Sequence, residues 1–463
     1  MKHPKGSIGI RKWGLILENK SSKTRLEFKA GLCMIRWIEN LHEKTGWDDG
    51  DMDAKKRNFI LMFIDPIVFT IGMTFLSVNA VMTYFLSNLG ASTFEIGLAN
   101  ALVSIGAFVS QPIFAKKVMN LPYKLKTFVK LLFAQRIFFL AFILTIPFFS
   151  VSHPHFMVML FLICWLGFNF FVGSYGPFYM SLFVKMIAVQ QRGRLKGYSG
   201  GIGNLLGLGI AYLIGILLAD IKFPYNYTVV FAIGIILLLI DVFVFALMKE
   251  LPDQITKINI NYFQYYKSIP KNFSDNPTFK KIVIAFSFMI ISQVSLAYYT
   301  LYAVRDFAAN SMQIALFTGL AGLVNFLGNI CFGILADKRS HRFVLIAASA
   351  CGAFAGIFAL TIHQLWAVFV AFALTNVCLT GYNLSNGILI IETVTKEKLP
   401  MCISINTVIT LIVSSIVTIG SSFLIDTFSF SIVFLITAIA GIIGCVVLYS
   451  YDSSRIRIRS NTM

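Results

Sequence analysis

Long apolar segments alternate with short polar connections along almost the whole chain from residue 59 onward. Twelve of them have about 20 residues or more, the length that an α-helix needs to cross the hydrocarbon core of a bilayer. The expected spans are 59–86, 93–114, 128–149, 156–184, 198–218, 227–248, 282–304, 313–335, 343–362, 365–391, 403–423 and 430–448. The pattern predicts an all-α polytopic membrane protein with twelve transmembrane helices.

The composition supports this class and excludes a soluble one. Hydrophobic residues make up 57% of the 463 residues and charged residues only 13%, against about 45–50% and about 25% in soluble proteins. The net charge of +18 is therefore read as a property of membrane loops and not as a sign of nucleic-acid binding. The seven cysteines lack metal-binding spacing and are expected to be small core residues.

The positions of the basic residues predict the orientation. All but three of the 39 Lys and Arg residues lie in the N-terminal segment, in alternate connections or in the C-terminal tail. The exceptions are Arg136, inside a span, and Lys222 and Arg305, on the opposite side. Because cytoplasmic loops carry the excess of Lys and Arg, we expect both termini to be cytoplasmic.

The chain repeats itself once. Residues 93–96 align with 311–314, and Tyr175 aligns with Tyr382. The expected parts are a basic cytoplasmic extension (1–58), a first six-helix bundle (59–248), a cytoplasmic linker (249–281), a second bundle (282–450) and a basic tail (451–463). For the extension, an amphipathic helix lying on the membrane at about residues 26–42 and an unstructured basic tail are both open alternatives.

Residues 333–342, Gly-Ile-Leu-Ala-Asp-Lys-Arg-Ser-His-Arg, resemble the cytoplasmic signature loop of the major facilitator superfamily, G-x-L-x-D-[RK]-x-G-[RK]-[RK]. They depart from it at Ser340 and His341. The resemblance implies two six-helix bundles, secondary transport by alternating access, and a cavity lined by spans one, four, seven and ten. Between spans eight and nine and at the end of span ten, it implies a latch that joins the bundles, made of Gly333, Asp337, Arg339, Arg342 and Glu392. The alternative is that these charges only anchor the helix ends at the membrane surface.

Three ionisable residues lie inside the expected spans. Because a charge buried in the membrane is costly, such residues are candidates for a functional role. Asp65 lies in span one, which the resemblance places at the cavity, and we expect it to couple transport to protons. A capping role at the membrane interface is the alternative. Arg136 in span three and Asp241 in span six lie at similar depth on supporting helices, so a structural ion pair is expected.

Neutral polar residues recur at helical spacing in the expected cavity helices, and each could instead bond one helix to another. The cavity candidates are Asn79, Asn169, Tyr175, Ser292, Tyr299, Asn376, Thr380 and Asn383. An uncharged amide and phenol lining suits an uncharged or weakly cationic organic molecule. Export of an amphipathic small molecule is favoured, with import of a neutral sugar-like solute as the alternative.

Other classes of function have little support in the sequence. No H-E-x-x-H, G-x-S-x-G or phosphate-binding G-x-x-x-x-G-K-[ST] motif occurs, so neither an enzyme nor an ATP-driven pump is expected, and no metal or cofactor. A membrane-embedded enzyme and a transporter-like sensor or scaffold remain the alternatives of another class. The expected partners are a small-molecule substrate and the lipid bilayer, and we expect a monomeric multi-pass protein of the cell membrane.

Overall fold

Twelve helical segments in the described part of the chain are long and apolar enough to cross a membrane, and they confirm the twelve predicted spans. The structure is a computed structural model that describes residues 49–250, 252, 277–394 and 399–450. Residues 26–42, for which a surface helix and an unstructured tail were the alternatives, lie outside these residues, as do most of the 249–281 linker and the basic tail 451–463.

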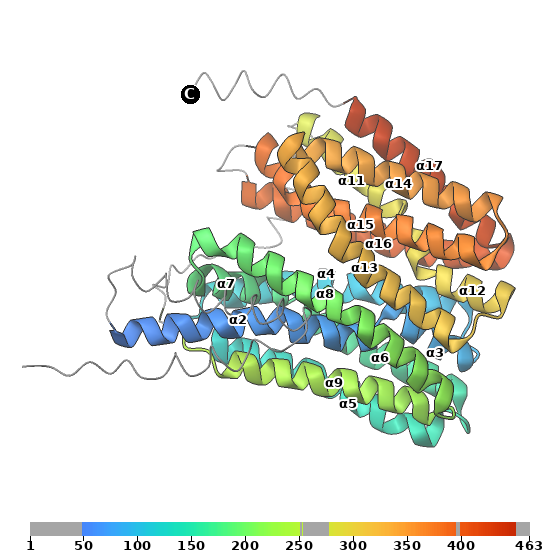
Figure 1. Cartoon of the computed structure of the whole chain (residues 1–463), viewed down its shortest axis with the longest axis horizontal. Coiled ribbons are helices and arrows are strands. Elements are labelled where there is room, and N and C mark those ends of the chain that lie inside the picture. The colour runs from blue at the N-terminus through green and yellow to red at the C-terminus, as the bar shows by residue number, and fades with distance from the viewer. Residues whose placement is uncertain (1–48, 251, 253–276, 395–398, 451–463) are drawn as a thin grey trace, which may run out of the picture. The chain divides into compact units, whose positions relative to one another are not determined.

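Each half of the chain forms six spans (Figure 1). The first half contains α2 (Asp49–Phe75), η1 (Val78–Met82), α3 (Thr83–Asn88), α4 (Thr93–Met119), α5 (Leu125–Phe149), α6 (Pro154–Val172), η2 (Tyr175–Tyr179), α7 (Met180–Met186), α8 (Val189–Asp220) and α9 (Tyr225–Ala246). The second half contains α11 (Pro277–Ile291), η3 (Val294–Ala297), α12 (Tyr299–Phe307), α13 (Ser311–Lys338), α14 (His341–Thr361), α15 (Leu365–Thr393), α16 (Leu399–Thr427) and α17 (Phe430–Tyr449).

The internal repeat is visible in how matching helices begin. The second span of the first half starts with a capping box in which the Ser92 side chain accepts from the Glu95 N–H and Glu95 accepts from the Ser92 N–H. The second span of the second half starts with the same arrangement between Asn310 and Gln313. Each box satisfies two N–H groups that the first helical turn leaves free, so the aligned sequences 93–96 and 311–314 encode the same helix start.

Spans one, four and seven are interrupted, although the sequence predicted continuous apolar helices there. Span one breaks at Ser77, whose backbone is extended, and resumes as the π-helix η1. Span four widens into η2 around Pro177, which has no N–H to donate to the helix. Span seven passes through the 3₁₀ segment η3 before α12. Such breaks free backbone groups within the membrane and are common at functional sites.

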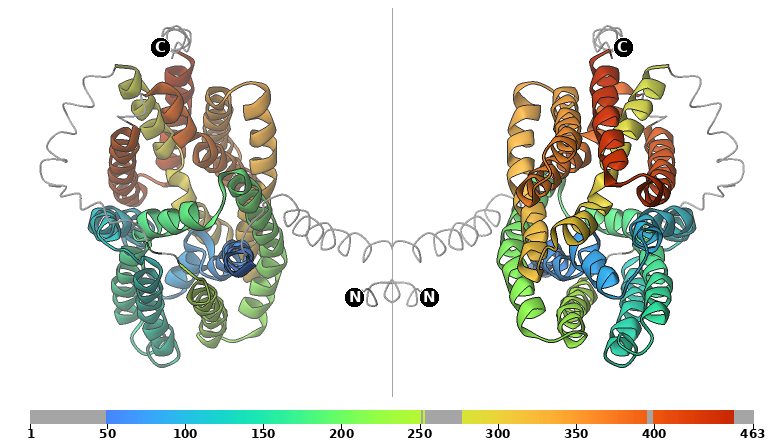
Figure 2. Two further views of the ribbon diagram at one scale, coloured as in Figure 1. Left: turned by 90° about the vertical axis from the view of Figure 1, so that its left-hand side faces the viewer. Right: turned by 90° about the vertical axis from the view of Figure 1, so that its right-hand side faces the viewer.

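The two halves contact each other mainly through two helix pairs. Helix α8 packs against α13, and α4 packs against α16. Within the halves, α5 packs against α6 and α9, and α14 packs against α15 and α17. Figure 2 shows the early helices, blue to green, on one side and the late helices, yellow to red, on the other.

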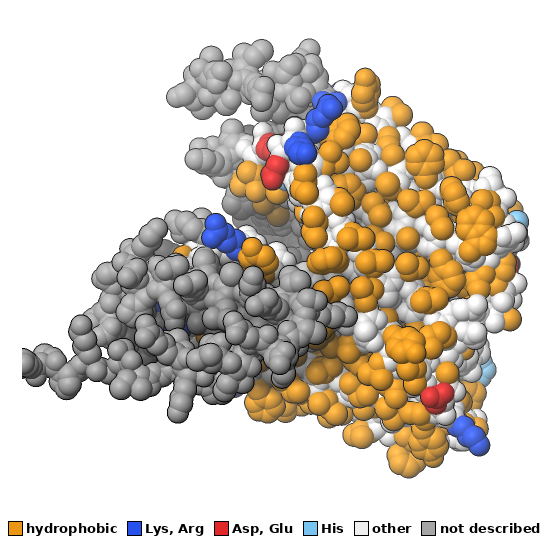
Figure 3. Space-filling model, viewed as in Figure 1, with side chains coloured by type: hydrophobic (Ala, Val, Ile, Leu, Met, Phe, Trp, Pro, Cys, Tyr) orange, Lys and Arg blue, Asp and Glu red, His pale blue; other side chains and the backbone are white. Residues whose placement is uncertain are grey.

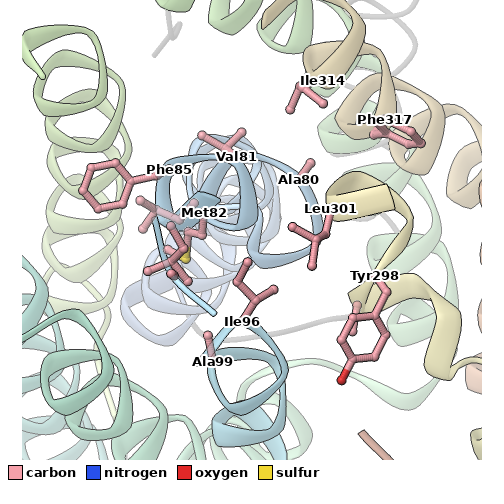
Figure 4. Close-up of a cluster of buried hydrophobic side chains, with 14 of the residues drawn as sticks. Ala80, Val81, Met82, Phe85, Ile96, Ala99, Tyr298, Leu301, Ile314 and Phe317 are labelled. Atoms are coloured by element: carbon pink, nitrogen blue, oxygen red, sulfur yellow. The ribbon is translucent and has the colours of Figure 1, made fainter. Parts of the chain in front are cut away.

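The buried apolar residues show that the halves are joined at one end only. One cluster includes Phe85 and Ile96 of the first half together with Leu301 and Phe317 of the second (Figure 4). At the opposite end the core divides into two clusters, one built only from the first half and one only from the second. The joined end is the one at which span one leads into span two.

The described surface of the spans is mostly apolar, as Figure 3 shows for one face. Large hydrophobic side chains such as Phe148, Phe243 and Tyr449 are more than half exposed. In water such a surface would drive aggregation, whereas lipid tails solvate it at no cost. The fold is thus that of a multi-pass integral membrane protein.

Candidate functional site

A buried ion pair lies between α5 and α9. Arg136 Nη2 lies 3.1 Å from Asp241 Oδ2, and both side chains are almost completely buried. The structure thus brings together the two residues that the sequence paired. A charge so deep in an apolar bundle is tolerated only when its hydrogen bonds are satisfied.

The Arg136 guanidinium has further partners from three helices. Nη1 donates to the Tyr175 hydroxyl at 2.7 Å and also to the Gln135 side chain. Nε lies 3.4 Å from the Leu238 carbonyl. The Tyr175 hydroxyl in turn donates to Gln135 Oε1 at 3.1 Å. Tyr175, predicted as a cavity residue, is therefore part of the charge cluster.

Asp65 joins this cluster from α2. It is 4% exposed, and its carboxyl group lies within hydrogen-bonding reach of the Asp241 carboxyl and the Tyr179 hydroxyl. The sequence treated Asp65 and the Arg136–Asp241 pair as separate features. The structure corrects this, because three helices converge and place two carboxyl groups against one guanidinium.

One oxygen of Asp241 lacks a donor. Asp241 Oδ1 is buried and receives no N–H or hydroxyl hydrogen bond from the described residues. The neighbouring Asp65 carboxyl can donate to Asp241 only when it carries a proton, since an ionised carboxylate is an acceptor alone. Two carboxylates and one guanidinium carry a net charge of about −1, which one bound proton would cancel.

The matching place in the second half is neutral. Tyr382, the repeat partner of Tyr175, lies near the side chains of Asn386, Asn406 and Thr410. None of these four side chains is charged at neutral pH. The arrangement of tyrosine and polar partners is repeated, while the carboxyl groups belong to the first half.

Two predicted cavity residues are packed inside the second half. The Ser292 hydroxyl donates to the Thr437 carbonyl of α17 at 3.0 Å. The Tyr299 hydroxyl lies 3.2 Å from Thr375 Oγ1, and its ring stacks on Phe434 with centroids 5.5 Å apart. Both side chains are fully buried. They join helices to one another, which was the open alternative.

Asn169 and Asn376 also lie in helix contacts. Each donates to the carbonyl four residues earlier on its own helix, at 2.8 Å to Trp165 and 2.9 Å to Phe372. A Cβ on Gly106 would lie 2.8 Å from the Asn169 Cβ, so α4 approaches α6 closely there.

The last three cavity candidates have different surroundings. Thr380 donates to Asn325 Oδ1 of α13 at 2.7 Å. Asn383 is exposed. Asn79 takes part through its backbone, because its carbonyl accepts from the Thr300 hydroxyl at 2.5 Å across the joined end of the halves.

A cavity of about 230 Å³, called the inner cavity below, lies between α2, α8 and α13. Its polar lining comes from Thr70, Thr74, Ser77, Asn204, Thr318 and Asn325. Sequence reasoning missed these six residues because it searched only spans one, four, seven and ten. Within span one it selected Asp65 and Asn79, which lie on either side of the lining residues along the helix. The available signal was the presence of amides within two largely apolar helices, among them Asn204 in span five and Asn325 in span eight.

A larger cavity of about 690 Å³ lies nearer the separated end of the halves. Arg194 and Lys196 contribute basic groups to it, while Phe326, Ile330 and Leu384 contribute apolar surface. Asn204 lines both cavities. We call this larger space the vestibule.

Among the described residues, the groups of the predicted latch have separate surroundings. Arg342 donates to the Leu448 and Tyr449 carbonyls at 2.9 and 2.6 Å and so caps α17. The Arg339 guanidinium lies 5.7 Å from the centre of the Phe343 ring. Asp337 and Glu392 are exposed, and no ion pair joins either of them to another described residue.

Gly333, which the resemblance placed in the latch, makes no close contact with another helix. A Cβ built there would meet no atom within 4 Å.

The first half contains an ion pair that the sequence did not predict. Lys185 Nζ lies 2.9 Å from Glu250 Oε1. Glu250 also accepts from the N–H groups of Lys124 and Leu125 at the start of α5, where the helix dipole favours negative charge.

The described residues contain no group of three or more His, Cys, Asp or Glu side chains that could hold a metal ion. The cluster around Arg136 therefore offers charge, hydrogen bonds and a place for a proton. The inner cavity offers neutral hydrogen-bonding groups that begin about one helical turn along α2 from Asp65, the member of the cluster on that helix.

Comparison with known proteins finds a family match for part of the chain. The sequence model described as "Major Facilitator Superfamily" matches residues 282–461. No curated protein sequence matches the chain. The whole fold is similar to that of several solved transporters at low sequence identity.

Three of these structures illustrate the range. A bacterial homologue of the iron transporter ferroportin in an inward-facing state has a TM-score of 0.65 and 14% identity, covering 86% of this chain and 99% of that one. The nucleoside transporter NupG has a TM-score of 0.63, 14% identity and the same coverage. The E. coli fucose:proton symporter FucP has a TM-score of 0.58 and 13% identity, covering 86% and 100%.

Proposed function

We propose that the chain is a secondary transporter of the major facilitator superfamily, whose sequence model matches residues 282–461, and that it couples the movement of a small uncharged organic solute to protons. Members of this superfamily are transporters and generally not enzymes. Both termini are cytoplasmic in this proposal, because the basic residues gather on their side of the membrane. The protein acts as a monomer in the cell membrane.

The observation that carries the coupling proposal is the contact between Asp65 and Asp241 beside Arg136. A proton held by the carboxyl pair balances the single guanidinium in a site without bulk water. Loss of that proton leaves an uncompensated buried charge, which favours a conformation that admits water. Proton binding and release thereby bias the two facing states, as alternating access requires.

The same arrangement suggests when the site exchanges protons. The apolar core joins the halves at the end where span one meets span two, while the cores are separate at the other end. With cytoplasmic termini, the separate end faces the cytoplasm. The structure would then be the inward-facing state, in which solute and proton leave or enter from the cytoplasm.

The lining of the inner cavity supports an uncharged solute, since no charged side chain contributes to it. Among similar structures, one is a nucleoside transporter and one a fucose:proton symporter. The sequence favoured export of an amphipathic molecule because of aromatic cavity residues. Tyr299 lies in the bundle core instead, which removes that support and favours the alternative of a neutral, sugar-like solute.

The coupling proposal is tested in proteoliposomes with an imposed pH difference. A ligand found by thermal shift is used to measure uphill accumulation and downhill exchange separately. Asp65→Asn should abolish accumulation and retain exchange, because the amide resembles the protonated acid. Asp306→Asn, at an exposed carboxyl on α12, is the matched control and should accumulate normally. Undiminished accumulation by Asp65→Asn would reject proton coupling at this site.

A sensor or scaffold is separated from a transporter by the same vesicles, because a scaffold would neither accumulate nor exchange the ligand. The latch of Asp337 and Glu392 stays a proposal for the opposite facing state, in which the cytoplasmic ends of the halves meet. On that proposal Asp337→Asn lowers the rate of exchange but leaves the affinity for the ligand unchanged. A variant that instead loses affinity would place Asp337 in binding.

A further inference from the structure

Thr318 lines the inner cavity, and its hydroxyl is buried without a partner among the described residues. Thr318 is 94% buried on α13, where it is 6% exposed, and its Oγ1 has no hydrogen bond to any described residue. Other buried threonines donate to a carbonyl of the preceding turn, as Thr375 does in α15 and Thr410 does in α16. A buried hydroxyl that lacks a hydrogen-bond partner destabilises the fold, so we expect another group to satisfy it.

Two amides at the same cavity offer complementary groups. The Asn204 amide donates to the Gly200 carbonyl at 2.8 Å, which leaves its Oδ1 as an acceptor. Asn325 Oδ1 accepts from Thr380 at 2.7 Å, which leaves its N–H groups as donors. Together with the Thr318 hydroxyl, α8 and α13 present both donors and acceptors to the cavity. A hydroxyl or amide group on a solute matches such a mixed set better than a group that only donates or only accepts.

The size of the cavity narrows the class of solute. Its volume of about 230 Å³ is below the range of roughly 300–1,000 Å³ that drug-sized ligands occupy. Glycine at two lining positions keeps the wall close: a Cβ on Gly322 would lie 3.3 Å from the Asn204 carbonyl oxygen, and one on Gly207 would lie 3.4 Å from Thr74 Oγ1. The site therefore fits a single small ring or a short polyol.

The inner cavity also touches the charge cluster. Phe69 lines the cavity, and its ring centroid lies 5.6 Å from that of Tyr175, whose hydroxyl accepts from Arg136. Phe69 follows Asp65 by four residues on α2, so both lie on one helix face. A solute that displaces Phe69 would therefore move the ring that supports the Arg136 network.

We infer that the inner cavity is the binding site for a small uncharged solute rich in hydroxyl or amide groups, with the Thr318 hydroxyl as a recognition group. This inference rests on the proposed transport function and specifies its substrate class. The vestibule leads to the site past Asn204. The Thr318 hydroxyl, the Asn204 oxygen and the Asn325 amide bind the solute, and Phe69 transmits its presence to the carboxyl pair.

The test is a thermal-shift titration of the purified full-length protein. The probes are uncharged monosaccharides, polyols, nucleosides and primary amides, with choline and benzoate as charged comparators. At least one uncharged probe should raise the unfolding temperature in a saturable way, because a ligand that binds only the folded state stabilises it. Stabilisation by the charged probes alone, or by no uncharged probe up to about 50 mM, would overturn the inference.

Variants at Thr318 then locate the site. Thr318→Val keeps the shape and removes the hydroxyl, so it should weaken the apparent affinity about tenfold. Thr318→Ser keeps the hydroxyl and should retain affinity within a few-fold, which guards against a folding defect. Thr228→Val on α9 removes a hydroxyl that bonds to the Pro224 carbonyl and should bind like the wild type. Equal affinity for Thr318→Val and the wild type would overturn the assignment.

The result is independent of proton coupling, because binding is measured at one pH without a gradient. If Asp65→Asn still binds the probe but the wild type shows no proton-driven accumulation, only the coupling proposal fails. If accumulation is proton-driven but Thr318→Val binds normally, only the site assignment fails.

Discussion

The rings of Phe69 and Tyr175 pack at a centroid distance of 5.6 Å with an interplanar angle of 53°. Phe69 borders the inner cavity, and Tyr175 belongs to the hydrogen-bond network of Arg136. This contact links the neutral inner cavity to the hydrogen-bond network beside the pair of carboxyl groups. It makes the coupling between solute and proton testable at a residue that carries no charge.

Phe69→Ala should uncouple the two movements. Without the ring, a solute in the cavity no longer presses on Tyr175, so the number of protons moved per solute should fall while downhill exchange continues. The ratio is measured in proteoliposomes with a pH-sensitive dye and labelled solute. Phe243→Ala, at an exposed ring on α9, is the control, and an unchanged ratio in Phe69→Ala would remove Phe69 from the coupling route.

Arg136→Gln should destabilise the protein strongly. Removing one partner of a buried ion pair leaves Asp241 uncompensated and costs about 3–5 kcal/mol. The unfolding temperature in detergent should fall clearly below that of the wild type. The double variant Arg136→Gln with Asp241→Asn removes both charges and should recover much of the loss, whereas a double variant as unstable as the single one would show that the pair does not matter for folding.

Glycine substitutions should distinguish a close helix contact from an open one. A Cβ on Gly106 would lie 2.7 Å from the backbone carbon of Asn169, so Gly106→Ala forces α4 and α6 apart and should cost about 1–3 kcal/mol. Gly333→Ala meets no atom within 4 Å and should be neutral or slightly stabilising, because alanine favours the helix. Unfolding temperatures of the two variants decide this, and a larger loss at Gly333 would contradict the structure.

Arg305→Ala should loosen the joined end of the halves. Arg305 Nη1 donates to Thr93 Oγ1 of the other half at 2.8 Å, and a partly buried hydrogen bond of this kind contributes about 0.5–1.5 kcal/mol. Opening at that end should become more frequent by a few-fold. Labelling of a cysteine introduced at Asn79, near the same end, should be faster in Arg305→Ala than in the parent protein, and an equal rate would show that the contact does not restrain opening.

Part of the site was readable in the sequence because burying charge in a membrane is so costly. Three ionisable residues inside apolar spans had to be partnered or functional, and Arg136 with Asp241 followed from their similar depth. The twelve spans and the two halves also followed from local pattern alone, since span length and loop charge depend on the bilayer and not on tertiary contacts. The capping boxes at Ser92 and Asn310 show that even the start of matching helices is encoded locally.

Only the tertiary structure decided which polar side chains share a space. Helical spacing places Tyr299 and Thr318 on a face of their own helices, but the rotation of each helix against its neighbours is set by packing of the whole bundle. Packing turned Tyr299 toward Phe434 and placed Thr318 in the lining of the inner cavity. The convergence of Asp65 with Asp241 has the same cause, because it depends on how α2 lies against α9, and residues so distant along the chain meet only after both helices have docked.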